Sequence, residues 1–513
     1  MKPINIIPAL LLLAASCSPK SPAGAEVFPL SGAKGVNPDT HLVLTFASAP
    51  TVGESGYICI YDAESGELVD QLDLSIPAGP TESRTYGPEC DYTAVPYDYA
   101  RTEMPTNRNT VPGTPSGTAE PTPPEYQLTI IGGFTDAFHF HPVIVHGNVA
   151  TVYPHNNMLE YGHKYFVTID DGALVCEGFS GVAEGEWTFS TKKSGPSDPF
   201  NLTVASDGSG DFNTVQGALD FIPDFCGTLT TVTVAPGDYE EIVYARNKTN
   251  VRIVGAGMDE TRVHYANNEV FNPHPLLVKT NEWPGTFPSR RAAFDLDNCS
   301  DITIEDMTIA TDLYGQAEGI LLNGERIALY GVHVIGSGDA IQANGTVYLE
   351  SCELDGGGDT FLGRGTVFGY RCNFRNDGGP FSWVRNTAGH HGDVFVECTF
   401  SGKEGRLADF GRTGNSEIEA KNSARPYPDA EFVVIDCKTK YFNPAGWGVI
   451  AQPTQTMLEY NTRDLDSGDP VDVSGRNPRS RQLDAIKDAA LIESYRDAAW
   501  VLGGWKPASY ITD

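Results

Sequence analysis

A repeat of short β-rich segments, recurring every 20 to 25 residues, constrains the fold of this 513-residue chain more than any other feature. The first apolar residues of four such segments are Ile302, Ile327, Val347 and Val367, which stand 25, 20 and 20 residues apart. A period of this length indicates a stacked repeat. Because glycine-rich stretches and no helical unit join the segments, we predict a parallel β-helix whose coils lie about 4.8 Å apart.

The register of the repeat can be tested inside the sequence. Five residues after the four starting points stand Met307, Val332, Cys352 and Cys372, and later segments place Cys398 and Cys437 in the same position. Small apolar side chains in one register predict an inward-facing stack. Parallel side chains on neighbouring coils favour packing over disulfide geometry, so we expect the cysteines to be buried thiols.

Two glycine-rich corners, "GSGDAIQ" and "GGGDTFLG", place aspartates in matching positions. Asp339 lies twelve residues after Ile327, and Asp359 lies twelve residues after Val347. Either corner alone would be interpreted as a turn, but the shared position predicts two carboxyl groups side by side on successive coils. Such groups repel each other unless one is protonated or a cation intervenes. Gln316 falls near the same line one coil earlier, which predicts an acid/base pair accompanied by an amide.

The N-terminal segment "MKPINIIPALLLLAASCSPK" has the pattern of an export signal. Its apolar run is too short for a membrane-spanning helix. The stretch "AASC" resembles a bacterial lipobox, so we predict a lipoprotein-type signal peptide over residues 1–17 and lipidation of Cys17, with a plain cleaved signal as the alternative. Residues 18–25 are predicted to be a linker.

Residues 26–191 alternate apolar and polar side chains between turn signals, as in "HLVLTF" and "YFVTID". This pattern predicts a β-sandwich, and the segment resembles the Ig-like domains of exported bacterial enzymes. A Pro/Thr-rich insert, Met104 to Glu125, interrupts it. Residues 192–199 are a predicted linker, and residues 200–513 form the predicted β-helix. The expected fold class is therefore all-β, an Ig-like β-sandwich followed by a parallel β-helix.

The run "FHFHPVIVH" carries three histidines, at positions 139, 141 and 146. No carboxylate or cysteine stands at ligand spacing within it, so we prefer ordinary strand histidines to a metal site.

The formal net charge of -32, from 35 basic and 67 acidic residues, excludes a typical nucleic-acid partner. It also repels a polyanionic substrate, which would have to be partly neutralised or met by a locally basic cleft. There are ten cysteines, so nine remain if Cys17 is lipidated and at least one must stay unpaired.

An ordered series of segments resembles the pectin methylesterases, beginning with "LTVASDGSGDFNTVQGALDFIP" and continuing through "QAEGILLNGERIALYGVHVIGSGDAIQ", "GGGDTFLG", "ARPYPDAEFVVIDC" and "FNPAGWGVI". The resemblance covers the chain from about residue 200 to the C-terminus. It implies a right-handed parallel β-helix that hydrolyses galacturonate methyl esters and releases methanol. It also implies a pectic polysaccharide partner and no metal or other cofactor.

The resemblance assigns roles to particular positions. Asp359 would be the nucleophile and Asp339 the acid and then the base, while Arg425 would keep Asp359 ionised through a charge-assisted hydrogen bond. Substrate contacts are implied for Tyr427, Gln342 and Phe361. The family has an oxyanion-binding glutamine immediately before the first aspartate, where this chain has a glycine. Gln316 is the first candidate to replace it, because losing an oxyanion donor typically costs about 10²–10³ in rate.

Several alternatives remain open from the sequence. The motif "GHHGD" would suit a β-helical polygalacturonase, but that reaction needs carboxyl groups about 6.5–9.5 Å apart and adjacent coils predict a closer pair. A pectate lyase would need an acidic calcium-binding cluster at the pair. A pectin-binding lipoprotein without activity, or an esterase or thioesterase for another acyl group, is also compatible. We expect an exported monomer, attached to the outer membrane if Cys17 carries lipid.

Overall fold

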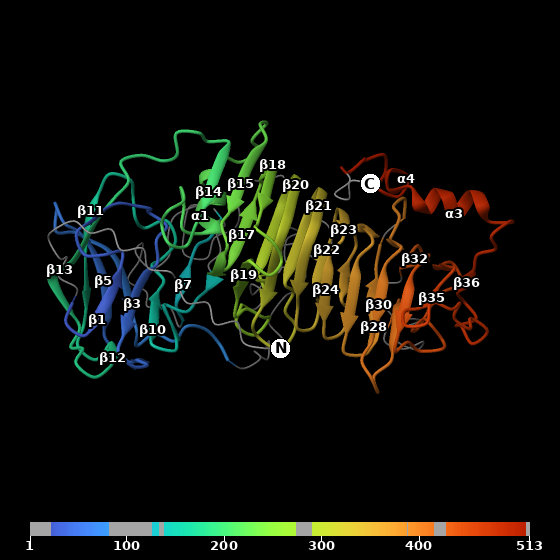
Figure 1. The fold of residues 1–513 in the computed structure, drawn as a ribbon, viewed down its shortest axis with the longest axis horizontal. Coiled ribbons are helices and arrows are strands. Elements are labelled where there is room, and N and C mark those ends of the chain that lie inside the picture. Colours follow the sequence, from blue (N-terminus) through green and yellow to red (C-terminus); the bar gives the residue numbers. More distant parts are fainter. Residues whose placement is uncertain are drawn as a thin grey trace, which may run out of the picture.

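The computed structural model describes residues 22–81, 126–132, 138–272, 290–386, 388–414 and 427–508. Cys17 and the Pro/Thr-rich insert lie outside these residues, so the predictions made for them stay predictions. Figure 1 shows a strand-rich body at the N-terminal end of the molecule and a long stack of strands extending away from it. In the part of the chain that the structure describes, no helix is long and apolar enough to cross a membrane.

The N-terminal body is a sandwich of two sheets whose strands alternate between buried and exposed residues. In Lys164–Ile169, for example, every second side chain is buried, and the side chain of Trp187 is fully buried in the core that the two sheets share. The first sheet contains β1 (Ala25–Phe28), β3 (Leu42–Phe46), β10 (Val149–Val152) and β9 (Val143–His146). The second contains β2 (Ala33–Val36), β13 (Val182–Thr191), β11 (Lys164–Ile169), β5 (Tyr57–Asp62) and β6 (Leu68–Asp73). Two short pairs accompany them, β4 (Thr51–Val52) with β12 (Leu174–Val175) and β7 (Leu128–Thr129) with β8 (Phe138–His139).

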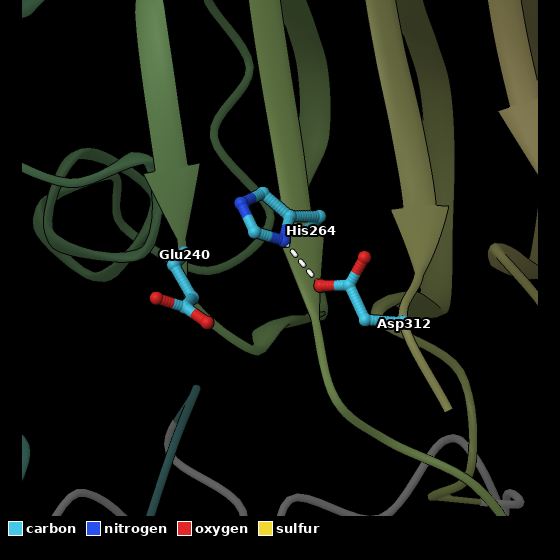
Figure 2. Close-up of side chains that lie close together, drawn as sticks. All are labelled: Glu240, His264 and Asp312. Carbon is cyan, nitrogen blue, oxygen red and sulfur yellow. Dashed lines mark hydrogen bonds and ion pairs between the residues drawn. The ribbon is translucent and has the colours of Figure 1, made fainter. Parts of the chain in front are cut away.

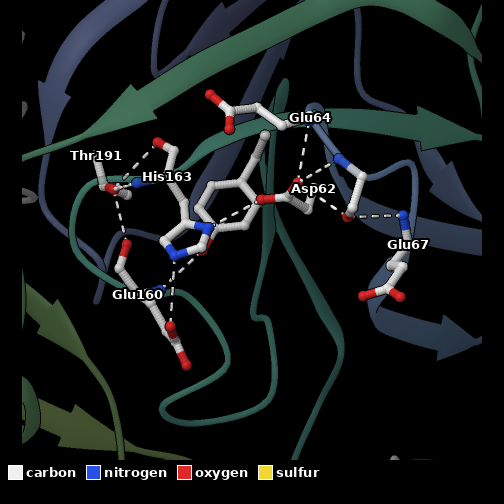
Figure 3. Close-up of polar contacts among 8 residues, drawn as sticks. Asp62, Glu64, Glu67, Glu160, His163 and Thr191 are labelled. Carbon is white, nitrogen blue, oxygen red and sulfur yellow. Dashed lines mark hydrogen bonds and ion pairs between the residues drawn. The ribbon is translucent and has the colours of Figure 1, made fainter.

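A polar cluster lies at one end of the second sheet, where β5 ends and β11 begins (Figure 3). The Nδ1 atom of His163 lies 2.9 Å from a carboxylate oxygen of Asp62. The other carboxylate oxygen of Asp62 accepts hydrogen bonds from the backbone of Glu64 and Ser65. The cluster therefore joins the end of β5 to the chain that enters β11.

The second body is a parallel β-helix, and its described residues form 23 strands. Three parallel sheets run along it. Sheet one contains β17 (Val243–Arg246), the first parts of β20 (Phe294–Thr311) and β21 (Ile320–Ile335), then β22 (Ile341–Ala343), β25 (Phe361–Gly363), β28 (Gly379–Val384) and β31 (Ala408–Arg412). Sheet two contains β14 (Asn201–Val204), β15 (Thr230–Val234), β18 (Thr249–Val254), the middle parts of β20 and β21, β23 (Thr346–Glu350), β26 (Thr366–Tyr370), β29 (Asp393–Val396), β32 (Glu431–Ile435), β34 (Thr456–Tyr460) and β36 (Arg481–Gln482). Sheet three contains β16 (Gly237–Glu240), β19 (Thr261–Tyr265), the last parts of β20 and β21, β24 (Glu353–Gly356), β27 (Asn373–Asn376), β30 (Thr399–Ser401), β33 (Lys438–Lys440) and β35 (Arg463–Asp464).

The register predicted from the repeat is confirmed. Ile302 pairs with Ile327, which pairs with Val347, which in turn pairs with Val367. From β20 onward, the turn between sheets two and three uses one residue with positive φ in each described coil, as at Ser351. The buried residue that follows is a cysteine in four coils, and all four thiols are buried and free: Cys352, Cys372, Cys398 and Cys437. The predicted all-β fold with a parallel β-helix is therefore confirmed.

Three helices among the described residues pack against the β-helix. Helix α1 (Val215–Phe221) buries Val215 and Leu219 against the first coils. Near the C-terminus, α3 (Ala489–Arg496) and α4 (Ala498–Val501) place Ile492, Tyr495 and Val501 against the outer face of sheet two. That face is therefore covered, which leaves sheets one and three to present functional side chains.

The sandwich packs on the first coils of the β-helix. Ile131 and Phe138 of the sandwich share an apolar cluster with Tyr244, Tyr265 and Phe271 of the β-helix. The histidine-rich run lies along this junction. The backbone N–H of residue 139 donates to the side chain of Asn272, the ring at 141 stacks on Phe271, and the ring at 146 contacts Glu240. These contacts use the three histidines for packing between the two bodies.

Candidate active site

The two predicted aspartates stand at equivalent positions where adjacent coils enter sheet one. Ile341 of β22 pairs with Phe361 of β25, and each aspartate precedes its paired residue by two positions. The glycines before them are required by close coil packing. A Cβ on Gly357 would lie 2.0 Å from the carbonyl oxygen of Ser337 on the previous coil. The corners are therefore turns that also bring two carboxyl groups onto one line.

Asp359 is held by Arg412, the last residue of β31. The Nε atom of Arg412 donates to one carboxylate oxygen at 3.1 Å and its Nη2 donates to the other at 2.6 Å. The indole of Trp383 lies under this guanidinium, with 4.7 Å between the Arg412 Cζ atom and the ring centroid. On the same indole, the Cζ atom of Arg385 lies 3.9 Å from the centroid. Trp383 therefore positions Arg412, which in turn binds the carboxylate of Asp359.

Arg412 was missed by the sequence analysis, which assigned this role to Arg425. Arg425 lies outside the described residues, so its assignment stays a prediction. The signal for Arg412 was present in the register of sheet one, because it pairs with Trp383 and Trp383 pairs with Leu362, three residues after Asp359. Finding it required aligning the coils of β28 and β31, whose paired residues Ser382 and Gly411 stand 29 apart, against 20 and 21 for the two preceding steps in sheet one.

Asp339 lies in a buried charged cluster centred on Arg291. The Nη2 atom of Arg291 lies 3.3 Å from a carboxylate oxygen of Asp339. Its Nε donates to both carboxylate oxygens of the fully buried Glu318, at 3.0 and 2.8 Å. Its Nη1 donates to the side-chain oxygen of Gln316 at 2.9 Å. One guanidinium therefore organises both the predicted acid and the predicted oxyanion donor, and the sequence analysis identified neither Arg291 nor Glu318.

The environment of Asp339 favours its protonated form near neutral pH. The residue is 8% exposed. Burial, followed by the negative charge of Glu318, raises the pKa of Asp339 to about 7, and Asp359 acts in the same direction. The positive charges of Arg291 and Arg385 oppose the shift. The pair is thus asymmetric, with a carboxylate held by Arg412 beside a carboxyl group whose surroundings disfavour ionisation.

The predicted substrate contacts have different outcomes. The implied role of Phe361 is wrong, because its ring is 2% exposed and packs inside the coil, 4.7 Å from the ring centroid of Phe374. Strand alternation points this residue inward. Tyr427 is 9% exposed, and its hydroxyl accepts a hydrogen bond from Arg364 at 3.0 Å. Gln342 lies on the same outward row of sheet one as Trp383. The roles predicted for Tyr427 and Gln342 stay predictions.

A histidine of the sequence motif "GHHGD" lies away from the aspartate pair. His391 of "GHHGD" lies 2.8 Å from Glu431 and packs against Tyr495 of α3. It therefore contacts the C-terminal helices, and the histidine expected of a polygalacturonase does not lie at the aspartate pair.

Asp295 shares the outward row of sheet one but is completely buried. Neither of its carboxyl oxygens has a hydrogen-bond partner among the described residues. Burial raises the pKa of Asp295 well above its ordinary value, and Glu318 adds to the shift. Burial therefore favours the neutral form of Asp295, which lies near the cluster around Arg291.

Known proteins were compared with the chain. The family model described as Pectinesterase matches residues 201–408. "Probable pectinesterase 8" of Arabidopsis thaliana is 25% identical over 312 residues, which cover 57% of this chain and 74% of that protein. Pectinesterase QRT1 of the same plant is 25% identical over 296 residues, covering 55% of this chain and 73% of that protein.

Among solved structures, the pectin methylesterase from carrot is 19% identical and has a TM-score of 0.48, with 61% of this chain and 95% of that chain covered. The fold assignment therefore rests on the strand pairing described above. The matched segment contains β14 to β30 and both aspartates. The β-helical part of this chain is therefore similar to the pectinesterases over residues 201–408.

Proposed function

We propose that the protein hydrolyses the C6 methyl esters of galacturonate residues in pectin and releases methanol. The observation that carries this proposal is the asymmetric carboxyl pair on adjacent coils. Asp359 is bound through both oxygens by Arg412, and burial favours the protonated form of Asp339. A nucleophile and a proton donor are the two groups that acyl transfer from an ester to water requires.

In the first step, a carboxylate oxygen of Asp359 attacks the C6 carbonyl carbon. The bond to the methoxy oxygen breaks, and the proton of Asp339 passes to that oxygen, so that neutral methanol departs. In the second step, Asp339, now a carboxylate, takes a proton from water while the water oxygen attacks the acyl carbon. Asp359 leaves as a carboxylate and Asp339 is protonated again, which completes the cycle.

Gln316 is suited to bind the oxyanion that forms in each step. Its side-chain oxygen accepts a hydrogen bond from Arg291, which turns its Nε2 donor away from that arginine. This donor has no hydrogen-bond partner in the part of the chain that the structure describes. A side chain at Gly338, where the family has a glutamine, would be crowded, because its Cβ would lie 3.0 Å from the carbonyl oxygen of Gly315 and 3.4 Å from the Cα of Gln316. Gln316, one residue beyond Gly315, therefore approaches the position that the family glutamine would occupy.

The location and the N-terminal body are part of the proposal. The enzyme is exported and attached to the outer membrane by lipid on Cys17, where it meets a polysaccharide outside the cytoplasm. The N-terminal sandwich belongs to the Ig-like class and holds the first coils of the β-helix through the apolar cluster at the junction. The protein acts as a monomer.

The test is methanol release from methyl-esterified pectin by the parent protein and by Asp359→Ala and Asp339→Ala. Both variants should lose methanol release while their thermal unfolding stays cooperative. Asp301→Asn is a matched control, because Asp301 is a half-buried aspartate of β20 whose carboxylate also pairs with an arginine, Arg326, at 2.6 Å. Methanol release that survives in either site variant would refute the assigned roles.

A further inference from the structure

A groove with a volume of about 450 Å³ opens beside the catalytic corners. It crosses four successive coils and is lined by Thr311–Tyr314, Gly336–Ser337, Asp355–Gly357 and Arg375–Asp377. The second and third of these segments end two residues before the catalytic aspartates. Gly336, Gly356 and Gly357 line the groove at that point and carry no side chain that could block it. A linear polymer lying in the groove would therefore pass next to the carboxyl pair.

Tyr314 forms one rim of this groove and has the most exposed large apolar side chain among the described residues, at 93%. The backbone around it is nevertheless fixed. The carbonyl oxygen of Tyr314 accepts a hydrogen bond from Asn268 at 2.9 Å, and the N–H of Gly315 donates to the hydroxyl of Ser337 at 3.0 Å. An exposed ring on a fixed backbone offers contact area at low entropic cost. One face of a pyranose ring consists of C–H groups, which pack well on such a ring.

The carboxylates that line the groove all have cationic or histidine partners. Asp312 accepts a hydrogen bond from Arg262 at 2.7 Å and contacts His264. Figure 2 shows His264 directed at Asp312, with Glu240 on its other side. Although burial opposes it, hydrogen bonds to Asp238 and Asp312 raise the pKa of His264 to about 9. The imidazolium and Arg262 thus place two positive charges next to Asp312.

The remaining charges of the groove are paired in the same way. Asp355 lies 2.8 Å from His333 and binds Arg375, whose Nη2 also donates to Glu353 at 2.7 Å. Asp377 lies 3.3 Å from Lys403. The one cation that lines the groove, Arg375, is therefore already engaged by two carboxylates. Within the described residues, the groove offers no unpaired positive charge to an incoming anion.

We propose that this groove selects stretches of esterified, uncharged galacturonate and that Tyr314 positions one of their sugar rings by stacking. This inference rests on the proposed function and names its substrate class. A free galacturonate carboxylate entering the groove would lose hydration without gaining a charged partner, and the chain's net charge of -32 adds repulsion. A methyl ester carries no charge and avoids both costs. An acidic protein would repel a polyuronate substrate. Methyl esterification removes the charge of that substrate, so a basic cleft is not needed.

The first test compares kcat/KM, expressed per ester group, on pectins of equal chain length and of high or low esterification. We expect at least a fivefold preference for the highly esterified polymer at low ionic strength, and a smaller preference in about 0.3 M salt, because salt screens the repulsion. Tyr314→Ala should raise KM about tenfold with little change in kcat, and Tyr314→Trp should restore KM. Tyr57→Ala, which removes another exposed tyrosine in the sandwich, should change neither. Equal kcat/KM on both polymers, or an unchanged KM in Tyr314→Ala, would overturn the proposal.

A binding measurement separates this proposal from the proposed function. Calorimetry with Asp359→Ala, which cannot turn over, should show tighter binding of methyl-esterified oligogalacturonate than of the de-esterified oligomer. Asp377→Asn leaves Lys403 without its partner in the groove and should narrow this difference. If the parent protein releases no methanol but this preference holds, the assigned reaction fails and the groove specificity stands. Equal binding of the two oligomers would refute the groove specificity even where methanol release is confirmed.

Discussion

The contact between Arg412 and Asp359 gives the sharpest prediction about catalysis. Replacing Arg412 with alanine removes two charge-assisted hydrogen bonds, 3.1 and 2.6 Å long, from the nucleophile. The proton shared by the carboxyl pair could then reside on either aspartate, so the assignment of one as nucleophile and the other as acid is lost. The carboxylate also loses the fixed orientation needed for attack.

The size of the effect follows from the geometry. A hydrogen bond to a charged group contributes about 1.5–3 kcal/mol. Because the two bonds share one guanidinium, we expect the pair to lower the barrier by about 3–4 kcal/mol rather than by twice the single value, which corresponds to a loss of about 10²–10³ in kcat. Arg412→Lys keeps the charge but not the two-point contact, so it should lose about tenfold.

Initial rates of methanol release at saturating pectin measure this loss. Arg326→Ala is the matched control, because Arg326 of β21 binds both oxygens of Asp301 of β20 at 2.7 and 2.6 Å. It should leave kcat unchanged. Arg425→Ala decides between the two arginines. A large loss in Arg425→Ala together with normal kcat in Arg412→Ala would refute the reasoning from the observed contact.

Three further predictions concern charge and pH. Glu318→Gln removes a negative charge that raises the pKa of Asp339, so the alkaline limb of the kcat/KM profile should move to lower pH; a shift to higher pH would contradict this. Asp295→Asn removes a buried carboxyl group whose pKa is raised. Chemical denaturation should show that the variant has a larger free energy of unfolding than the parent protein, and this difference should grow as pH rises. Below about pH 4 the difference should be absent, because the carboxyl group is neutral in both the folded and the unfolded state. The hydrogen bond to Asp62 raises the pKa of His163, so this pair contributes fully below about pH 6.5 and less as pH rises through the folded-state pKa; His163→Gln should therefore cost more stability at pH 6 than at pH 9, and an equal cost at both would contradict the ion pair.

The β-helix was predictable because each coil repeats the same physical problem. The inward positions of successive coils must be filled by side chains of similar size, so Ile302, Ile327 and Val347 report the register directly. The two aspartates could be found for the same reason, since they lie one coil apart in constant phase. Regular periodicity therefore carries both the fold and the position of the pair.

The partners of the pair were not predictable in this way. The paired residues Val243 and Phe294, which flank the position of Arg291 in the sequence, are 51 positions apart, and Ser382 and Gly411, which precede Arg412, are 29 apart. Counting residues in steps of 20 to 25 therefore reaches neither arginine. Phe361 was misjudged because the motif places it beside a catalytic residue, whereas strand alternation turns its side chain into the core. Sequence spacing identified the two aspartates. The arginines that bind them lie on coils whose spacing departs from the repeat.

The balance of these charges explains how two similar corners acquire different roles. Arg412 and Asp359 form one pair, and Arg291 and the buried Glu318 form another. Asp339 is the remaining carboxyl group, and the arginine that lies 3.3 Å from it is already engaged by Glu318. Burial and the negative charge of Glu318 outweigh the positive charges of Arg291 and Arg385, so the neutral form of Asp339 is the one that this arrangement favours. A neutral carboxyl group is what a proton donor must be, so the role of Asp339 is defined by its buried surroundings and by Glu318 rather than by any feature of its glycine-rich corner.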